Sequence, residues 1–207
     1  MFLRQTVAPA SEPISLSEAK AHLRVDISDD DTLITALITA ARQFAETECT
    51  RALITQQWQL VLDAFPGPSL LGAPYGVPYS IPGHAILLDR PPVQSVESIQ
   101  YQDMSGAWQT MQSTDYVAEL QSAPARITPG FGKIWPITLP QIGAVKVNFT
   151  AGYGNAAAVP QGIKAWMLIR IATLYENREE VATMNRGKLE PLPYVDRLLD
   201  AYRVPML

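Results

Sequence analysis

The sequence is poor in the residues that most often carry chemistry. Its 207 residues include one cysteine, Cys49, and two histidines, His22 and His84. A single cysteine excludes an internal disulfide framework and agrees with a reducing compartment. A zinc site needs three or four clustered Cys, His or carboxylate ligands, and no such spacing occurs. Because a lone cysteine is usually a small core residue rather than an activated nucleophile, we expect no catalytic site and no metal site.

The chain also lacks a basic excess and long apolar runs. Its formal net charge is −4 and its pI is about 5.2, whereas proteins that grip phosphate backbones carry clustered Lys and Arg. No stretch approaches the roughly 18 apolar residues of a membrane span, and the first fifteen residues lack the apolar core of a signal peptide. The sequence predicts a soluble, cytosolic protein whose main work is not binding to nucleic acid or to a membrane.

Proline, in contrast, is abundant. The 17 prolines cluster in the middle of the chain, where they interrupt helices and punctuate loops, so long helices are expected only toward the two ends. Residues 65–83 alone hold five prolines and four glycines, which predicts a long surface loop. Because 47% of the residues are hydrophobic, the chain can still bury a large core.

The segment Val159–Glu180 is the strongest helix signal. Pro160 suits the first helical turn, where its missing N–H breaks no hydrogen bond. Apolar residues at helical spacing cover one broad face, while Trp166 and Ile169 fall on the opposite side. Arg170 is the only charge between Ala165 and Tyr175. A helix that is apolar nearly all round is buried against several partners, which can be the rest of its own fold or a neighbouring copy.

Two shorter helices are expected near the N-terminus. Ser15 and Glu18 form an S-x-x-E capping box ahead of the first helix, and Ile14 is placed to pack as a staple residue. The run Asp29–Asp31 opens the second helix, where carboxylates complement the helix dipole. The same run does not match a calcium-binding EF-hand loop that would start at Asp26. The sixth position of such a loop is glycine and the twelfth is glutamate, whereas this sequence has Asp31 and Leu37 there.

The middle of the chain predicts an antiparallel sheet. From Thr55 the apolar residues alternate with period two, as in a half-buried strand. Further strands are expected at Ala85–Leu88, Val96–Tyr101, Ala107–Met111, Tyr116–Val117, Arg126–Ile127 and Val145–Phe149. A hairpin is expected to join Val96–Tyr101 to Ala107–Met111.

The pattern as a whole predicts an α+β fold, in which N-terminal helices and one long helix pack with a central antiparallel β-sheet. The predicted parts are an N-terminal helical part at 1–52, a β part at 53–155, the long helix at 156–182 and a C-terminal tail at 183–207. The tail holds a polar bridge, Thr183–Lys188, and a short amphipathic helix around Tyr194–Tyr202. Because this helix is too short to stand alone, it must dock on something, which can be another protein.

Charge is laid unevenly along the chain. Residues 52–125 contain six acidic groups and one basic group, whereas residues 126–175 contain five basic groups and no acidic one. The two segments can neutralise each other within one monomer. Alternatively, opposite patches can set the register of a head-to-tail contact between copies, as in a ring.

One glycine motif is typical of cofactor sites. Gly152, Gly154 and Ala157 form a G-x-G-x-x-A between a strand and a helix, as in dinucleotide-binding turns. In that motif the helix starts within the glycine run, whereas Pro160 places the start after it. The acidic residue expected about 20 positions later would be Glu176, within the same helix. We interpret the glycines as a sharp turn from sheet to helix and expect no cofactor.

Several segments together resemble a known family. They are SLSEAKAHLRVD, DDDTLITALITAAR, RALITQQWQLVLDAFP, LLDRPPVQSVESIQYQD, the PARI and WP signals, VKVNFTAGYG and VPQGIKAWMLIRIATLYENRE. They cover nearly the whole chain, and the sheet-to-helix turn followed by the helix that ends in YENRE is the most specific. The sequence is similar to the head–tail connector (adaptor, or head-completion) proteins of long-tailed phages, prophages and gene transfer agents.

The resemblance implies a structural protein without catalytic residues. Members of the family form a ring of identical subunits, usually a dodecamer, which docks beneath the portal protein of the capsid and offers a platform to a stopper or tail-completion protein. The resemblance implies a place at the head–tail junction of the virion after synthesis in the bacterial host cytoplasm. Genome DNA would pass through the lumen without specific binding, and an acidic wall that repels phosphate suits such a conduit.

In this family the C-terminal segment engages the portal, and LLDAYR is similar to the family's ending. The resemblance therefore implies portal contacts by Leu198, Leu199, Tyr202 and Arg203. The loop 66–83 departs from the family by its length, so the family's tail-side contacts do not transfer to it. Two alternatives stay open at this point: another ring component such as a stopper or tail-completion protein, and a small enzyme with a cleft between helices and sheet.

Overall fold

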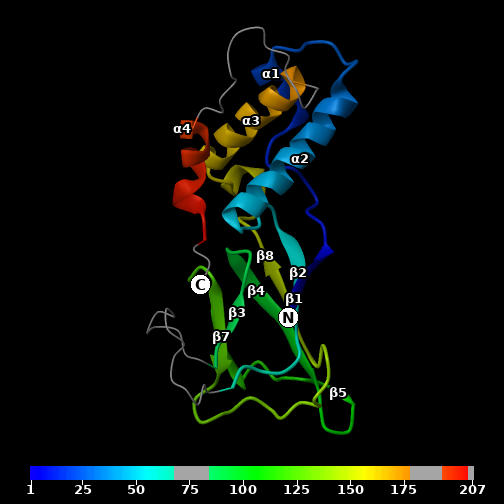
Figure 1. Ribbon diagram of the computed structural model, residues 1–207, viewed down its shortest axis with the longest axis vertical. Coiled ribbons are helices and arrows are strands. Elements are labelled where there is room, and N and C mark those ends of the chain that lie inside the picture. The colour runs from blue at the N-terminus through cyan, green and yellow to red at the C-terminus, as the bar shows by residue number, and fades with distance from the viewer. Residues whose placement is uncertain (68–83, 178–192, 205–207) are drawn as a thin grey trace. The chain divides into compact units, whose positions relative to one another are not determined.

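A computed structural model of the chain describes residues 1–67, 84–177 and 193–204 (Figure 1). The chain divides into two units. The strand unit comprises Met1–Pro9, Thr55–Gly152 and Val204–Leu207, and the helical unit comprises Ala10–Ile54 and Tyr153–Arg203. Most of the loop expected at 65–83 and the whole of the bridge Thr183–Lys188 lie outside the described residues. The four-part division expected from the sequence stays a prediction.

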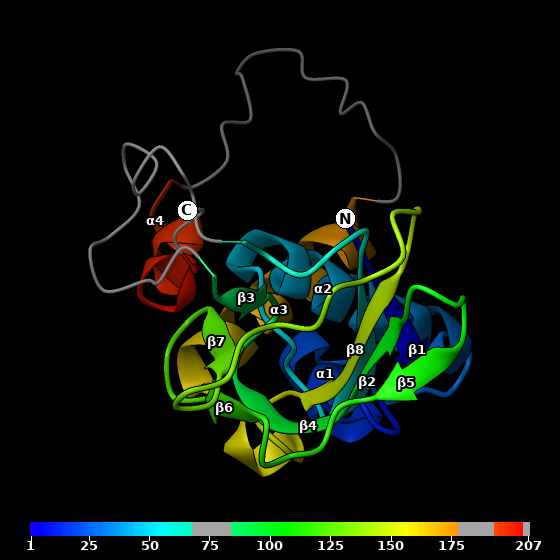
Figure 2. The ribbon, with the colours of Figure 1, turned by 90° about the horizontal axis from the view of Figure 1, so that it is seen from below.

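The strand unit contains two antiparallel sheets where the sequence predicted one (Figure 2). The five-stranded sheet has the order β1 (Phe2–Val7), β2 (Gln56–Leu62), β8 (Val145–Ala151), β4 (Val93–Gln102) and β5 (Trp108–Thr110). The three-stranded sheet has the order β3 (Ile86–Leu88), β7 (Ala125–Pro129) and β6 (Tyr116–Glu119). The proline pair Pro91 and Pro92 lies between β3 and β4. Because proline has no N–H to donate, these two residues interrupt the backbone hydrogen bonding of the strands, and β3 and β4 belong to different sheets.

Strand β8 forms the middle of the five-stranded sheet, between β2 and β4. Its residues alternate between buried and half-buried, and Val145, Val147 and Phe149 are fully buried, which confirms the predicted period of two. Val147 is paired with Leu60 on one side and with Ile99 on the other, and all three side chains are at most 1% exposed. This row is the core of the unit.

Strand β1 was not among the strands expected from the sequence. Among the described strands it pairs only with β2, and its register includes Phe2 with Val61 and Gln5 with Trp58. Being the edge strand of the sheet, it has one neighbour there and mostly exposed side chains. The alternation that reveals a half-buried strand is therefore absent from its sequence.

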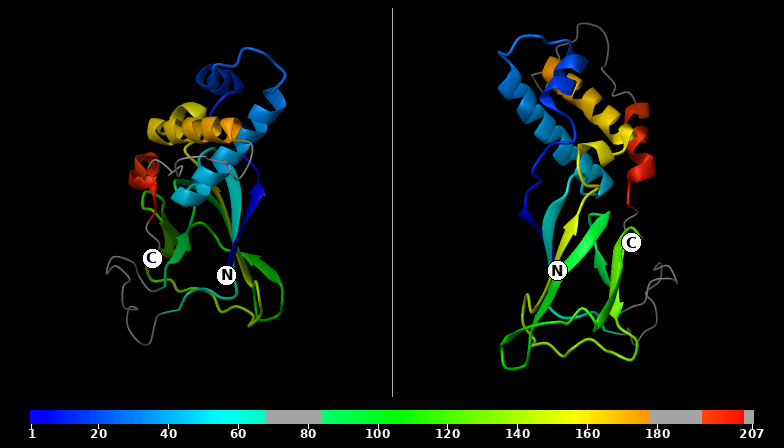
Figure 3. Two further views of the ribbon diagram at one scale, coloured as in Figure 1. Left: turned by 45° about the horizontal axis from the view of Figure 1, so that its top comes forward. Right: turned by 180° about the vertical axis from the view of Figure 1, so that it is seen from behind.

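The helical unit is built on α1 (Leu16–Leu23), α2 (Asp31–Cys49) and α3 (Gln161–Glu176) (Figure 3). A short 3-10 helix, η1 (Ala156–Ala158), precedes α3, and α4 (Pro193–Asp196) runs into the 3-10 helix η2 (Arg197–Tyr202). None of the helices within the described ranges is long and apolar enough to cross a membrane.

The start of α1 confirms the predicted cap. The backbone N–H of Glu18 donates to Ser15 Oγ at 3.1 Å, and Ile14 is 1% exposed beneath it. The run Asp29–Asp31 opens α2 as predicted, with Asp31 in the first turn. Asp30 occupies the N-cap position without a side-chain capping bond, and its Oδ2 instead accepts a 2.5 Å hydrogen bond from the Tyr175 hydroxyl. The Asp30 carboxylate therefore joins two helices.

Helix α3 begins directly after Pro160 and ends at Glu176; the expected continuation at 178–180 lies outside the described residues. Trp166 is fully buried, as are Ile163, Met167 and Ile171, so the helix is buried on more than one side as its sequence predicted. Its apolar residues are not all covered, because Leu174 is 44% exposed. The partners that bury α3 are α2, α1 and the C-terminal helices α4 and η2.

Candidate functional site

The C-terminal segment (Pro193–Arg203) carries all four residues implied to contact a portal. It consists of α4 and η2 and packs on α2 and α3. Val195 is 8% exposed and Leu199 is fully buried, and both belong to the helical core. The tail that the sequence expected to dock on something therefore docks, over these residues, on its own helical unit.

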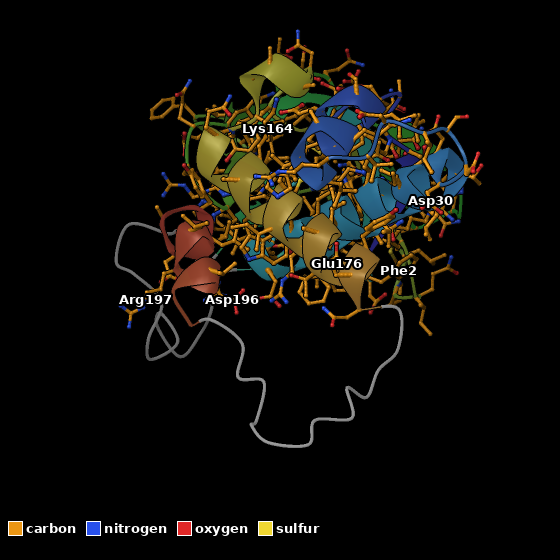
Figure 4. The ribbon with its side chains drawn as sticks, turned by 90° about the horizontal axis from the view of Figure 1, so that it is seen from above. Phe2, Asp30, Lys164, Glu176, Asp196 and Arg197 are labelled. Carbon is orange, nitrogen blue, oxygen red and sulfur yellow. The ribbon has the colours of Figure 1, made fainter. Side chains whose placement is uncertain are left out.

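Asp196 is the polar anchor of the C-terminal segment. Its Oδ1 accepts one hydrogen bond from Trp166 Nε1 and one from Arg170 Nη2, both at 3.0 Å. Figure 4 shows Asp196 on the side toward α3 and Arg197 on the outer side. The hydrogen bond from Trp166 and the charge of Arg170 hold the pKa of Asp196 below its usual value. The anchor is therefore ionised at neutral pH.

Aromatic rings surround this anchor. Phe44 on α2 stacks on Trp166 with ring centroids 5.8 Å apart. The guanidinium carbon of Arg170 lies 5.1 Å from the Trp166 centroid and 5.7 Å from the Phe44 centroid, within the range of a cation–π contact. Arg170 is thus held by two rings and one carboxylate, and these contacts connect α2, α3 and the C-terminal segment.

Asp196→Asn is expected to loosen the C-terminal segment without unfolding the helical unit. Because folding lowers the pKa of Asp196, the charged carboxylate stabilises the docked segment above the unfolded pKa of about 3.9, and this contribution is lost as the pH falls through the folded value. The side chain is 47% exposed, so the loss at pH 7 should not exceed roughly 1 kcal/mol.

Hydrogen exchange of the segment's amides, corrected for intrinsic rates, measures this effect. At pH 7 the parent chain should be better protected than the Asp196→Asn variant, and acid should remove the difference. Equal protection of the two proteins at pH 7 would show that the carboxylate does not anchor the segment.

The end of the C-terminal segment fits a gap left by a glycine. A Cβ added at Gly162 would lie 3.0 Å from Cε2 and 3.1 Å from the hydroxyl oxygen of Tyr202, which is tighter than ordinary van der Waals contact. The missing side chain of Gly162 therefore makes room for the Tyr202 ring. Arg51 Nε donates to the backbone carbonyl of Tyr202, so the residues that follow α2 hold the end of the segment as well.

Arg203 adds two ion pairs at the surface. Its Nη2 lies 3.1 Å from Glu48 Oε2 on α2, and its Nη1 lies 3.1 Å from Asp200 Oδ1. The Arg203 side chain is 43% exposed, so these pairs contribute little to stability. They do hold the guanidinium in one place, where an incoming carboxylate can compete for it.

The structure places the four predicted contact residues unequally. Leu199 is fully buried, so in this conformation it is a core residue that a partner cannot reach. Tyr202 is half-buried against Gly162. Leu198 is 37% exposed and Arg203 is also exposed. A partner can reach Leu198 and Arg203 directly, and portal contact by any of the four residues stays a prediction.

Sequence reasoning missed the residues that receive the C-terminal segment. Trp166 and Asp196 are 30 positions apart, and Arg51 and Tyr202 are 151 positions apart, so no local pattern connects them. One signal was available: Arg170 is the only charge in an apolar stretch of α3, and a charge in a buried helix needs a partner. The sequence does not say which carboxylate that partner is.

The one cysteine is buried and un-ionised. Cys49 is fully buried, and burial raises the pKa of its thiol to about 11, so the thiolate is not populated at neutral pH. His22 belongs to the helical unit and His84 to the strand unit. Within residues 1–67, 84–177 and 193–204, no group of three or more His, Cys, Asp or Glu side chains could hold a metal ion.

The sequence matches one family model, described as phage gp6-like head-tail connector protein, over residues 13–75. The matched stretch begins just before α1 and includes α2 and β2. No curated protein matches the chain. Over residues 13–75 the family match confirms the resemblance to head–tail connectors that the sequence motifs indicated.

Three solved structures are similar over the full length, each covering 100% of this chain and 97% of the other chain. A chain of the neck of an empty gene transfer agent particle, computed with C6 symmetry, has a TM-score of 0.76 and 22% identity. A chain of the virion of a native gene transfer agent particle has a TM-score of 0.75 and 23% identity. A chain of the native particle's neck, computed with C12 symmetry, has a TM-score of 0.73 and 22% identity. The α+β fold is therefore shared with these chains.

Proposed function

We propose that the chain is a structural head–tail connector (adaptor) of a tailed phage or phage-like particle, located at the head–tail junction of the virion. The observation that carries the proposal is the fold match to a chain of a particle neck, which covers 100% of this chain with a TM-score of 0.76. The match of residues 13–75 to the connector family supports it independently. The role requires assembly and not turnover, which agrees with the buried, un-ionised thiol of Cys49.

A ring of identical subunits is part of the proposal. The similar neck structures were computed with C6 and C12 symmetry, and both symmetries are compatible with a dodecamer. A head-to-tail ring needs two different surfaces on each copy. A net charge of −4 suits a ring through which DNA passes without being held, since acidic walls repel phosphate.

The proposed partners are a portal protein and a stopper or tail-completion protein. On the portal side we assign contact first to Leu198 and Arg203, because both are exposed on the C-terminal segment. The segment is positioned by the Asp196 anchor, so the two residues are presented in a fixed arrangement. Tyr202 and Leu199 would hold the segment on the helices and so position Leu198 and Arg203. They would contact the portal themselves only if the segment left the helices.

Binding to the portal protein of the same particle tests the function. Mass measurement and electron microscopy of the mixture should show a ring of this chain on the portal. Leu198→Glu is expected to weaken binding at least about tenfold, or roughly 1.4 kcal/mol, because it places a charge in an apolar contact. Ile27→Glu is the matched control, since Ile27 is 61% exposed in the same unit but lies outside the C-terminal segment.

Two outcomes would contradict the proposal at different levels. A chain that remains monomeric and does not bind the portal at any concentration is not a connector. A ring that binds the portal equally well with Leu198→Glu remains a connector, but its portal contact lies elsewhere.

A further inference from the structure

Exposed apolar side chains gather at one end of the five-stranded sheet. At this end β2 finishes, β4 passes into β5, and β8 begins. The loop Gly130–Ala144, called the apolar loop, connects β7 to β8 there. Its exposed large apolar residues are Phe131 at 106%, Ile134 at 86%, Ile137 at 78% and Ile142 at 89%. Side chains of this kind are normally buried, so a surface that presents four of them in one loop is an interaction surface.

The apolar loop is fixed to the rest of the strand unit. The N–H of Gly130 donates to the Asp115 carbonyl at 2.9 Å, and the N–H of Leu139 donates to the Gln102 carbonyl at 3.0 Å. The N–H of Gly143 donates to Asp63 Oδ1 at 2.9 Å. These hydrogen bonds, at both ends and in the middle of the loop, give its backbone a defined conformation. The backbone conformation in turn exposes the apolar side chains to solvent.

A cavity of about 700 Å³ lies beside the first half of the apolar loop. Phe65 and Trp135 stack in its wall with centroids 4.7 Å apart and an interplanar angle of 3°. Trp135 Nε1 donates to the His84 carbonyl at 2.7 Å, which fixes the indole. Ile134 and Ile137 also line the cavity, and among its described lining residues Lys133 is the one Lys, Arg, Asp or Glu. Lys133 Nζ lies 3.4 Å from Asp115 Oδ1, and 58% of the lysine side chain is exposed, so this surface ion pair is weak and leaves the amine accessible to a second carboxylate. The cavity is thus an apolar receptor with a basic group at its wall.

The β4–β5 hairpin offers a matching projection. Met104 lies at its tip and is 63% exposed. The Asp103 carboxylate shapes the turn by accepting from the N–H groups of Ser105 at 2.9 Å and Ala107 at 3.1 Å. Hydrogen bonds from the Ser105 and Gln109 side chains, together with these two, lower the pKa of Asp103 to about 2. The tip therefore presents a flexible apolar side chain next to a permanent negative charge.

The hairpin tip and the cavity are different surfaces of the strand unit. Figures 2 and 3 show the β4–β5 hairpin on one side and β3 and β7 on the other. The cavity is lined by His84 and Pro129 next to β3 and β7, and its wall residue Phe65 also lies 5.8 Å from the Tyr101 ring near the end of β4. Met104 is not among the described residues that line the cavity of its own copy. Two different surfaces on one copy are what a head-to-tail contact between copies requires.

We propose that the Met104 tip of one copy docks in the Phe65–Trp135 cavity of the next copy, so that the strand units form a head-to-tail ring. A thioether adapts to irregular apolar cavities and makes favourable contacts with aromatic rings. In both surfaces the charge stands directly beside the apolar residue: Asp103 precedes Met104, and Lys133 precedes Ile134. This pairing of opposite charges sets the register of the contact. The inference rests on the proposed connector function and assigns its intersubunit surface.

A second copy explains more of the surface than a small ligand does. The exposed apolar residues extend beyond the cavity to Phe131 and Ile142, which do not line it. A small molecule in the cavity would leave these two uncovered, whereas a neighbouring subunit covers a wide area. Lys146 Nζ lies 4.0 Å from the centroid of the Trp108 ring on β5, so its amine is already held by a cation–π contact.

A cysteine pair tests the contact. The double variant Met104→Cys/Ile137→Cys should form disulfides between copies when oxidised, both alone at high concentration and on the portal, and give a ladder that ends in a closed ring. The native Cys49 is fully buried and does not interfere. Val117→Cys/Ile137→Cys is the matched control, because Val117 is 59% exposed in the same unit but lies on β6; it should give no ladder.

A charge at the tip provides the second measurement. Met104→Asp should weaken assembly at least about tenfold, while Met104→Leu should retain it, because only the first places a charge in the cavity. A ring on the portal without the 104–137 ladder overturns this interface and leaves the connector function standing. A monomer that ignores the portal overturns both. A monomer whose native mass includes a tightly held small molecule identifies the cavity as a ligand site and also overturns the interface.

Discussion

Trp166→Ala should destabilise the helical unit by about 3–5 kcal/mol, the range for removing a large aromatic side chain from a core. Trp166 is fully buried and takes part in three kinds of contact. It stacks on Phe44 at 5.8 Å, lies 5.1 Å from the Arg170 guanidinium carbon, and donates to Asp196 at 3.0 Å. Replacement by alanine removes all three and leaves a cavity, so both the helix packing and the C-terminal segment are affected.

Trp166→Phe separates the polar contact from the packing. Phenylalanine keeps an aromatic ring against Phe44 but has no N–H for Asp196, so the expected loss is smaller, about 1–2 kcal/mol. Urea unfolding followed by helix circular dichroism measures both variants. If the alanine variant loses less than about 1 kcal/mol, the side chain is not the centre of the helical core. If phenylalanine and alanine cost the same, the hydrogen bond to Asp196 matters more than the ring.

The sequence predicted those elements whose signals are local. The S-x-x-E box at Ser15 forms the cap of α1, Pro160 precedes the first residue of α3, and the alternation of β8 matches its burial. In each case the physical cause lies within a few neighbouring residues: a hydroxyl that reaches an N–H three positions on, a fixed φ, or a period of two. Such features can be read from one sequence.

The features that the sequence did not predict depend on distant partners. The run Asp29–Asp31 opens α2 as expected, but the sequence did not show that the Asp30 carboxylate accepts a hydrogen bond from the Tyr175 hydroxyl, 145 positions away. Strand β1 exists because β2 provides an edge for it, and its own residues show no burial pattern. Leu199 was a portal-contact candidate because LLDAYR is similar to the ending of the connector family, and in this conformation the helices of its own chain bury it. The tertiary fold decides which of several possible apolar or polar partners a residue contacts.

Anchoring and exposure are combined in the C-terminal segment. The buried pair of Val195 and Leu199 attaches it to the helical core, and Asp196 fixes its rotation by two hydrogen bonds. These contacts leave Leu198 and Arg203 on the outer surface. A connector must offer a partner a surface that is formed before the partner arrives, because a rigid contact surface saves the cost of ordering on binding. The buried pair gives the segment this property, and the ionised Asp196 carboxylate adds to it.

Removal of the buried charge on α2 is expected to have an effect as large as that of the tryptophan. Arg42 is 6% exposed and Glu46 is 7% exposed. Arg42 Nη1 lies 2.8 Å from Glu46 Oε2, and Arg42 Nε lies 2.7 Å from Glu12 Oε2. The other carboxylate oxygen of Glu46 accepts from the N–H of Leu53 at 2.9 Å. The group therefore connects α2 to the segment before α1 and to the chain after α2.

Arg42→Ala should cost about 3–5 kcal/mol, because it removes the cation beside the buried Glu46 carboxylate, and breaking a buried pair is far more destabilising than the intact pair is stabilising. The double variant Arg42→Met/Glu46→Gln is the matched control: it removes both charges, keeps the volume, and retains an oxygen for the Leu53 N–H. Its loss should be much smaller, about 1 kcal/mol. Urea unfolding at pH 7 compares the two. If the double variant is as unstable as Arg42→Ala, packing and the bond to Glu12 carry the stability, and the buried charge does not.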